Sequence, residues 1–116
     1  FKTIKSLVYA IISHRALDRP VAGYALERGA LWENAITGAV FARYLAERHG
    51  HPDPETVFTA ALLRDLGKIV LEDFVGDAYA ALDEHVRGAR VGFQEAERQL
   101  LGFDHTEVGE QVGLKW

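Results

Sequence analysis

Residues 61–71 read Ala-Leu-Leu-Arg-Asp-Leu-Gly-Lys-Ile-Val-Leu, and this is the most informative segment of the sequence. Gly67 stands where one apolar helical run should break or bend before the next begins. Arg64 lies seven residues after Val57, which places it on the helix side that should face the core, where a charge needs a partner. Asp65 or a residue of another helix could be that partner. The segment therefore contributes either to an ion pair that holds helices together or to a polar pocket.

Helical patterns continue upstream of this segment. Asp53 can cap the free amides of a helix that begins at Pro54 and runs to about residue 65. A longer helix is predicted before it, over residues 31–49, with Gly50 as its stop. Its buried side is expected to hold Ile36, Val40, Phe41, Tyr44 and Leu45.

An apolar stripe predicts a further helix at the start of the chain, ending near residue 15. Its members follow the i, i+3, i+4, i+7, i+8 pattern of a helix packed on a core. The pattern begins almost at residue 1, and the chain ends on Trp116, so we expect the domain to be truncated at both ends. Additional helices on the N-terminal side should then cover the stripe, and a stripe packed wholly within these 116 residues would contradict that expectation. The stripe consists of Ile4, Leu7, Val8, Ile11 and Ile12.

The rest of the chain is also helical in pattern. Residues 16–30 are predicted to be a loop with a short helical piece around residues 24–28. Asp104 and Glu107 are spaced like a capping box, directly after the stop residue Gly102. No run alternates as a strand would, so the predicted fold is all-α, with six to eight short helices. The remaining helical runs cover residues 68–74, 77–86, 93–101 and 104–112.

Composition limits the classes of function. The 116 residues suit one domain or part of one, because independent domains usually have about 100 to 150 residues. Thirteen Lys and Arg against seventeen Asp and Glu give a net charge of −4 without a basic block, so nucleic acid is not a predicted partner. The absence of Cys excludes disulfides and thiol catalysis and fits a reducing compartment. Charges interrupt every apolar stretch before the roughly 18 residues that a membrane span needs, and we expect a cytoplasmic protein with no membrane contact.

Two common catalytic motifs are absent. A phosphate-binding loop would continue from Gly67 and Lys68 with a hydroxyl residue, but Ile69 follows. Ser6 and Ser13 lie in the apolar first helix, and neither belongs to a Gly-x-Ser-x-Gly motif. Neither kind of chemistry is therefore predicted.

Two segments resemble known sequence motifs, and each has a substitution at the position of a histidine. Residues 62–71 resemble the Leu-Leu-His-Asp-Ile-Gly-Lys segment of the HD superfamily, with Arg64 at the position of the His. Residues 31–34, Leu-Trp-Glu-Asn, resemble a Leu-Trp-x-His segment, with Asn34 at the position of its His. This second segment is typical of the HD-related output domains, called HDOD.

A third segment extends the resemblance to the end of the chain. Residues 102–109 resemble the HDOD segment Gly-x-x-His-x-x-Val-Gly, with Glu97 before it and Trp116 after it. The three segments occur in the family's order over residues 31–116. The chain therefore resembles a partial HDOD domain over residues 1–116, which implies an HD-like helical bundle.

The departures from the family pattern bear on metal binding. Catalytic HD proteins are metal-dependent phosphohydrolases that use a His, a His-Asp pair and a later Asp as ligands. Only Asp65 matches that set here, because the guanidinium of Arg64 has no free lone pair and Asn34 is at best a weak carbonyl ligand. Asp104 is better explained as a helix cap than as the final Asp. We expect Arg64 or Lys68 to balance the charge of Asp65 in place of a metal, with Asn34 supplying hydrogen bonds.

The resemblance and its departures together predict a non-catalytic signal-transduction module within a larger bacterial regulatory protein. Its partner would be another protein, another domain of the same chain or a small ligand. The alternative is a metal-dependent phosphohydrolase or cyclic-nucleotide phosphodiesterase with an atypical site and Mn, Fe or Mg as cofactor. In the preferred interpretation there is no catalytic residue, metal or cofactor, and His105 has a core or capping role more readily than a ligand role. The vestigial HD-site pocket would consist of Asn34, Arg64, Asp65, Lys68 and His105.

Overall fold

The computed structural model describes residues 2–76 and 78–115, and these residues form an all-α fold, as predicted. Within them there is no named strand, only an isolated bridge between Val21 and Leu26. The predicted helix start at Asp77 and the Trp116 of the family resemblance lie outside the described residues. The elements in chain order are α1 (Lys2–Leu17), the 3-10 helix η1 (Ala22–Tyr24), α2 (Ala30–Arg48), α3 (Pro54–Leu63), α4 (Leu66–Val75), α5 (Ala78–Ala89), α6 (Phe93–Leu101) and α7 (His105–Leu114).

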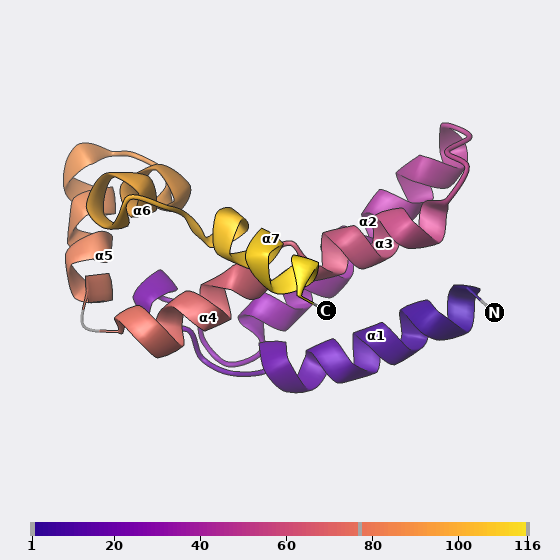
Figure 1. Ribbon diagram of the computed structural model, residues 1–116, viewed down its shortest axis with the longest axis horizontal. Coiled ribbons are helices and arrows are strands. Elements are labelled where there is room, and N and C mark those ends of the chain that lie inside the picture. Colours follow the sequence, from indigo (N-terminus) through magenta and orange to yellow (C-terminus); the bar gives the residue numbers. More distant parts are fainter. Residues whose placement is uncertain (1, 77, 116) are drawn as a thin grey trace.

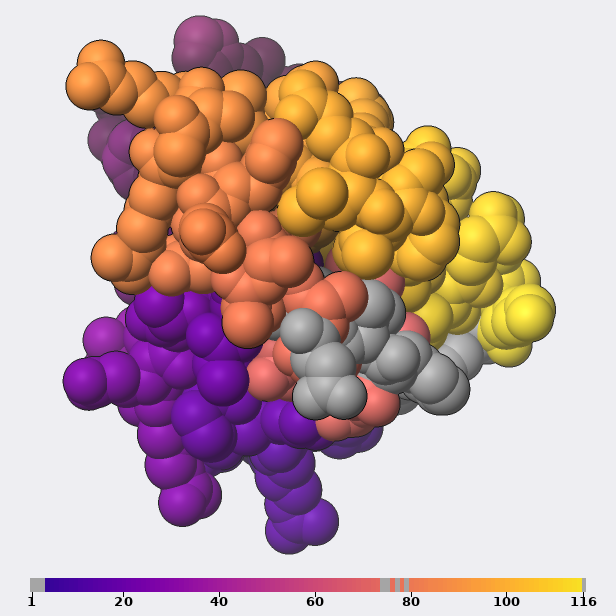
Figure 2. Space-filling view, turned by 90° about the vertical axis from the view of Figure 1, so that its left-hand side faces the viewer, coloured from indigo at the N-terminus to yellow at the C-terminus, as the bar shows by residue number. Residues whose placement is uncertain are grey.

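The molecule is elongated, with extents of 44 × 28 × 26 Å. Helices α2 and α3 form an antiparallel hairpin at one end, with α1 beside it, while α5 and α6 make up the other end (Figure 1). Helices α4 and α7 pack against each other in the middle. Figure 2 shows the end formed by α5 and α6 in orange, with the purple segment that contains η1 lying directly below α5.

The hairpin between α2 and α3 confirms the predicted turn chemistry. Helix α2 ends one residue earlier than predicted, and Gly50 adopts φ +68°, a left-handed conformation that favours glycine. The Asp53 side chain accepts a hydrogen bond from the backbone N–H of Thr56, and Pro54 opens α3. Local residue types thus fix where the chain reverses.

The predicted buried side of α2 is wrong for four of its five residues. Val40, Phe41, Tyr44 and Leu45 are exposed, and Ile36 is only half-buried. The helix instead buries Leu31 and three alanines. The small alanine side chains let α3 approach closely, and the shared core includes Phe58 and Leu62 of that helix. The buried residues of α2 are Leu31, Ala35, Ala39 and Ala46.

Helix α1 also turns a different face toward the core than its apolar pattern predicts. The five residues of its apolar stripe are 46 to 68% exposed, while Ser6, Ser13 and Leu17 are buried. The hydroxyl of Ser6 donates to the carboxylate of Glu55 on α3, which holds the polar side of α1 inward. The described residues do not cover the stripe, and its cover by additional helices stays a prediction.

The loop after α1 differs from its predicted form. The helical piece is η1 at Ala22–Tyr24 instead of residues 24–28, and α1 runs two residues beyond the predicted end. The backbone N–H groups of Ala22 and Gly23 each donate to the Glu72 carboxylate of α4, at 3.1 Å. This contact between distant segments fixes the loop and leaves no trace in local sequence.

Gly67 allows α4 and α7 to cross closely. The sequence predicts a break at Gly67, but the structure places the break just before, between Leu63 and Leu66, and Gly67 lies in the first turn of α4. An ideal Cβ at Gly67 would lie 1.8 Å from the carbonyl oxygen of His105 and 2.9 Å from the backbone nitrogen of Gly109. The glycine is therefore required by the crossing of the two helices.

Candidate functional site

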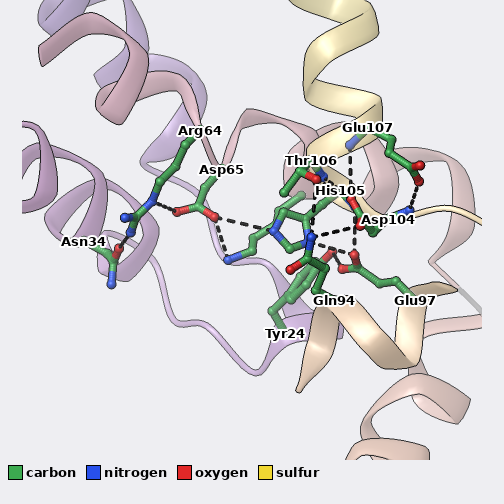
Figure 3. Close-up of polar contacts among 11 residues, drawn as sticks. Tyr24, Asn34, Arg64, Asp65, Gln94, Glu97, Asp104, His105, Thr106 and Glu107 are labelled. Carbon is green, nitrogen blue, oxygen red and sulfur yellow. Dashed lines mark hydrogen bonds and ion pairs between the residues drawn. The ribbon is translucent and has the colours of Figure 1, made fainter. Parts of the chain in front are cut away.

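The structure brings all five predicted site residues into one connected group (Figure 3). Asn34 comes from α2, Arg64 and Asp65 from the joint between α3 and α4, Lys68 from the first turn of α4, and His105 from the first residue of α7. The group lies where these helices meet in the middle of the molecule. Each member contacts at least one other member, as the following distances show.

Asp65 is the centre of the group and is only 6% exposed. One carboxylate oxygen lies 2.8 Å from the Lys68 ammonium, and the other lies 3.1 Å from Nε of Arg64. Burial by itself would raise the pKa of the Asp65 carboxyl, but the hydrogen bonds and charges of Lys68 and Arg64 outweigh burial and lower that pKa. Both oxygens of the carboxylate therefore face cations.

Arg64 does not face the core, contrary to the prediction. Its side chain is 54% exposed. The buried positions here are Phe58 and Leu62 of α3 and then Asp65, so the neighbouring Arg64 points to the surface. Its Nη2 donates to the side-chain oxygen of Asn34 at 2.7 Å. Its guanidinium lies over Gly38 of α2, where an ideal Cβ would be 3.8 Å away. Arg64 thus links α2 to the start of α4 at the surface.

His105 connects this group to a second, fully buried carboxylate. Its Nδ1 lies 2.7 Å and its backbone nitrogen 2.8 Å from the same oxygen of Glu97, and its Nε2 lies 3.8 Å from Asp65. The hydroxyl of Tyr24 donates to the other oxygen of Glu97. Burial by itself would raise the pKa of Glu97, but the hydrogen bonds from His105 and Tyr24 outweigh burial and lower it.

The roles of Tyr24 and Glu97 were not predicted. Glu97 entered only as a neighbour of the third family segment, and Tyr24 lies in the loop whose shape depends on α4. A glutamate at a fully buried helix position is unusual unless it is paired, but the burial of Glu97 is visible only in the fold. The two residues extend the group into one connected network from η1 to α2. The ammonium of Lys68 also lies 5.4 Å from the ring centroid of Tyr24, which links the two ends of this network directly.

The family model that describes the HDOD domain matches residues 1–116. The chain belongs to the HDOD family. The resemblance found in its three segments is thereby confirmed, whereas no curated protein and no solved structure matches the chain. Within the described part of this HDOD domain, no helix is long and apolar enough to span a membrane.

The residues of this HDOD domain do not fit the divalent metal of catalytic HD proteins. A metal at Asp65 would have to displace the Lys68 ammonium and the Arg64 guanidinium, and neither protonated group can serve as a ligand. The Asn34 oxygen already accepts from Arg64. Over residues 2–76 and 78–115, no cluster of three or more His, Asp or Glu side chains could hold a metal ion.

The start of α7 in the HDOD domain confirms the predicted capping box. Asp104 accepts hydrogen bonds from the backbone N–H groups of Thr106 and Glu107, and the Glu107 side chain accepts from the backbone N–H of Asp104. Gln94 and Arg98 of α6 also contact the Asp104 carboxylate, at 2.9 and 2.7 Å. Burial by itself would raise the pKa of Asp104, but the hydrogen bonds that it accepts lower this pKa strongly, and the one from the Thr106 hydroxyl contributes most. Asp104 thus has a structural role that keeps His105 in place.

We predict that Asp104→Asn lowers the free energy of unfolding by about 1 to 2 kcal/mol at pH 7, because it weakens a charged cap. The pKa of Asp104 is depressed in the folded state, so its contribution is complete above its unfolded pKa of about 4 and declines as the pH falls further. The difference between variant and wild type should therefore shrink at pH 3. Urea unfolding at both pH values measures it.

Asp83→Asn is the matched control for this prediction. Asp83 pairs with Arg87 on the surface of α5, and its substitution should change stability by less than about 0.5 kcal/mol. An Asp104→Asn variant as stable as this control would contradict the capping role.

Proposed function

We propose that this HDOD domain is a non-catalytic signal-transduction module that acts by binding. Its partner would be another protein, another domain of the same chain or a small ligand, within a larger regulatory protein of the bacterial cytoplasm. The observation that carries the proposal is the occupation of Asp65, whose two oxygens both lie within 3.1 Å of cationic nitrogens.

The requirements of metal-dependent hydrolysis also support the proposal, because the residues at Asp65 do not meet them. A hydrolytic HD site holds a divalent metal that activates water and neutralises phosphate charge. Here Arg64 and Lys68 supply two positively charged groups at the carboxylate, so the negative charge of Asp65 is compensated without a metal. A guanidinium cannot act as a general base either, because it stays protonated.

We predict that the protein binds Mn²⁺ or Mg²⁺ no more tightly than about millimolar and hydrolyses neither phosphomonoesters nor cyclic dinucleotides. Titration calorimetry and turnover assays with either metal measure this. The double variant Asn34→His/Arg64→His restores imidazoles beside Asp65, and we expect it to bind Mn²⁺ at least about tenfold more tightly than wild type. Metal-dependent turnover by the wild type that disappears in Asp65→Ala would contradict the proposal and favour the phosphohydrolase alternative.

A further inference from the structure

A shallow groove, wide open to solvent, lies between one face of α2 and the guanidinium of Arg64. Besides Arg64, all of its lining residues belong to α2. Arg64 uses Nε on Asp65 and Nη2 on Asn34, so Nη1 has no hydrogen-bond partner among the described residues. The groove is lined by Ala30, Glu33, Asn34, Thr37, Gly38, Phe41 and Arg64.

Asn34 offers a second donor among the residues that line the groove. Its side-chain oxygen accepts from Arg64, and this fixes which end of the amide faces the guanidinium. The amide nitrogen, which carries two hydrogens, is then left without a partner among residues 2–76 and 78–115. Figure 3 shows this nitrogen at the end of Asn34 that points away from Arg64. Two neighbouring side chains thus offer unused donors in one groove.

The charges around the groove define what it can accept. Arg64 and Lys68 carry two positive charges, which face the carboxylate of Asp65 and the more distant, fully buried carboxylate of Glu97. Lys68 is largely buried, so half-exposed Arg64 is the one of these four charged groups that lines the groove. Glu33 lines the same groove and opposes an anion, so affinity for a free anion must be modest.

The far end of the groove is aromatic. Phe41 is 60% exposed and stacks against Tyr44, with ring centroids 6.5 Å apart. It lies one helical turn beyond Gly38, which is close enough for one small molecule to contact both the guanidinium and the ring. An exposed ring beside a cationic fork suits a ligand with a charged end and a flat apolar part.

We propose that this groove binds the phosphate group of a small phosphorylated molecule, with Arg64 and Asn34 as donors and Phe41 as the contact for an aromatic part of the ligand. The inference rests on the proposed function, in which Arg64 takes the place of a metal beside Asp65, and it assigns a ligand to Arg64. An arginine whose fork is already oriented by Asp65 and Asn34 presents its remaining N–H groups to phosphate oxygens with little loss of side-chain freedom.

The first experiment is an NMR titration of the protein with inorganic phosphate, at constant ionic strength and with EDTA present. We expect millimolar binding, with shifts centred on the amides of Asn34 and Gly38, and at least about tenfold weaker binding in Arg64→Gln. Arg87→Gln is the matched control, because Arg87 is also exposed and pairs with one carboxylate, and its phosphate affinity should equal that of wild type. Glu33→Gln should tighten binding by about twofold, since it removes the opposing charge.

The second experiment tests the aromatic end by comparing phenyl phosphate with methyl phosphate. Phenyl phosphate should bind several-fold more tightly than methyl phosphate to the wild type, and Phe41→Ala should abolish that preference. Failure to bind phosphate, binding unchanged in Arg64→Gln, or binding that requires added metal would each overturn the proposal. Binding without metal that fails in Arg64→Gln supports it. A wild-type protein that fails to bind phosphate could still exclude Mn²⁺ and Mg²⁺ in the titration of the proposed function, so the two claims fail separately.

Discussion

A single methyl group at position 67 is expected to destabilise the protein by at least about 3 kcal/mol. The Cβ that Gly67→Ala adds would lie 1.8 Å from the carbonyl oxygen of His105, 2.8 Å from its carbonyl carbon and 2.9 Å from the backbone nitrogen of Gly109. All three are backbone atoms inside or at the start of α7, so no side-chain rotation relieves the clash. The two helices would have to move apart, which would also separate His105 from Asp65.

Gly109→Ala is a control from the other side of the same crossing. A Cβ at Gly109 would lie 3.5 Å from the backbone nitrogen of Gly67, which is an ordinary contact. Alanine is also the better helix former, by up to about 1 kcal/mol in a helix interior. We therefore expect Gly109→Ala to be neutral or slightly stabilising. Thermal and urea unfolding of both variants measure the contrast, and a Gly67→Ala protein as stable as wild type would contradict the α4 and α7 crossing.

Turn and cap chemistry could be predicted because it is local. Asp53 with Pro54 and Asp104 with Glu107 satisfy backbone N–H groups within three residues of themselves, so their roles can be recognised without knowledge of the fold. Gly50 likewise marks the end of α2 by its own backbone conformation. The helix bounds therefore differ from prediction by only a few residues.

Burial was predicted less well because periodicity does not identify the packing partner. The stripe of α1 and the side of α2 that includes Phe41 are apolar, yet the described residues leave both exposed. Helix α2 instead buries alanines against α3, and α1 turns Ser6 inward because Glu55 accepts its hydroxyl. An apolar face shows only that a helix can be covered on that side, while the choice between two faces depends on tertiary contacts.

The site also contains residues that could be predicted from the sequence and residues that could not. Asn34, Arg64 and Asp65 could be found because they occupy the positions of family ligands. The contact of Arg64 with Asp65 follows from their opposite charges, and that with Asn34 from the acceptor oxygen of the amide. The link from His105 through Glu97 to Tyr24 could not be found in this way, since it joins residues up to 73 positions apart. That part of the network required the fold.

Removal of the Glu97 side chain is expected to cost about 3 to 5 kcal/mol, because it leaves buried donors unpaired. Glu97→Ala would remove the acceptor of three groups, the backbone N–H of His105, its ring Nδ1 and the hydroxyl of Tyr24. Glu97 is fully buried, so water cannot replace the carboxylate without opening the helices around it. The N-terminal end of α7 would then be held to α6 mainly through the contacts of Asp104 with Gln94 and Arg98.

Glu97→Gln separates the hydrogen bonds from the charge. The glutamine oxygen can accept both donors of His105, and its amide can donate to the Tyr24 hydroxyl, so we expect a cost of only about 1 to 2 kcal/mol at pH 7. Because the folded pKa of Glu97 is depressed, the wild-type advantage over this variant is complete above the unfolded pKa of about 4.3 and shrinks as the pH falls below it. Tyr24→Phe removes one hydrogen bond and should cost about 1 kcal/mol. Urea unfolding from pH 7 to pH 3 distinguishes these cases, and equal stability losses in the alanine and glutamine variants would show that the charge of Glu97, and not its set of hydrogen bonds, holds α7 in place.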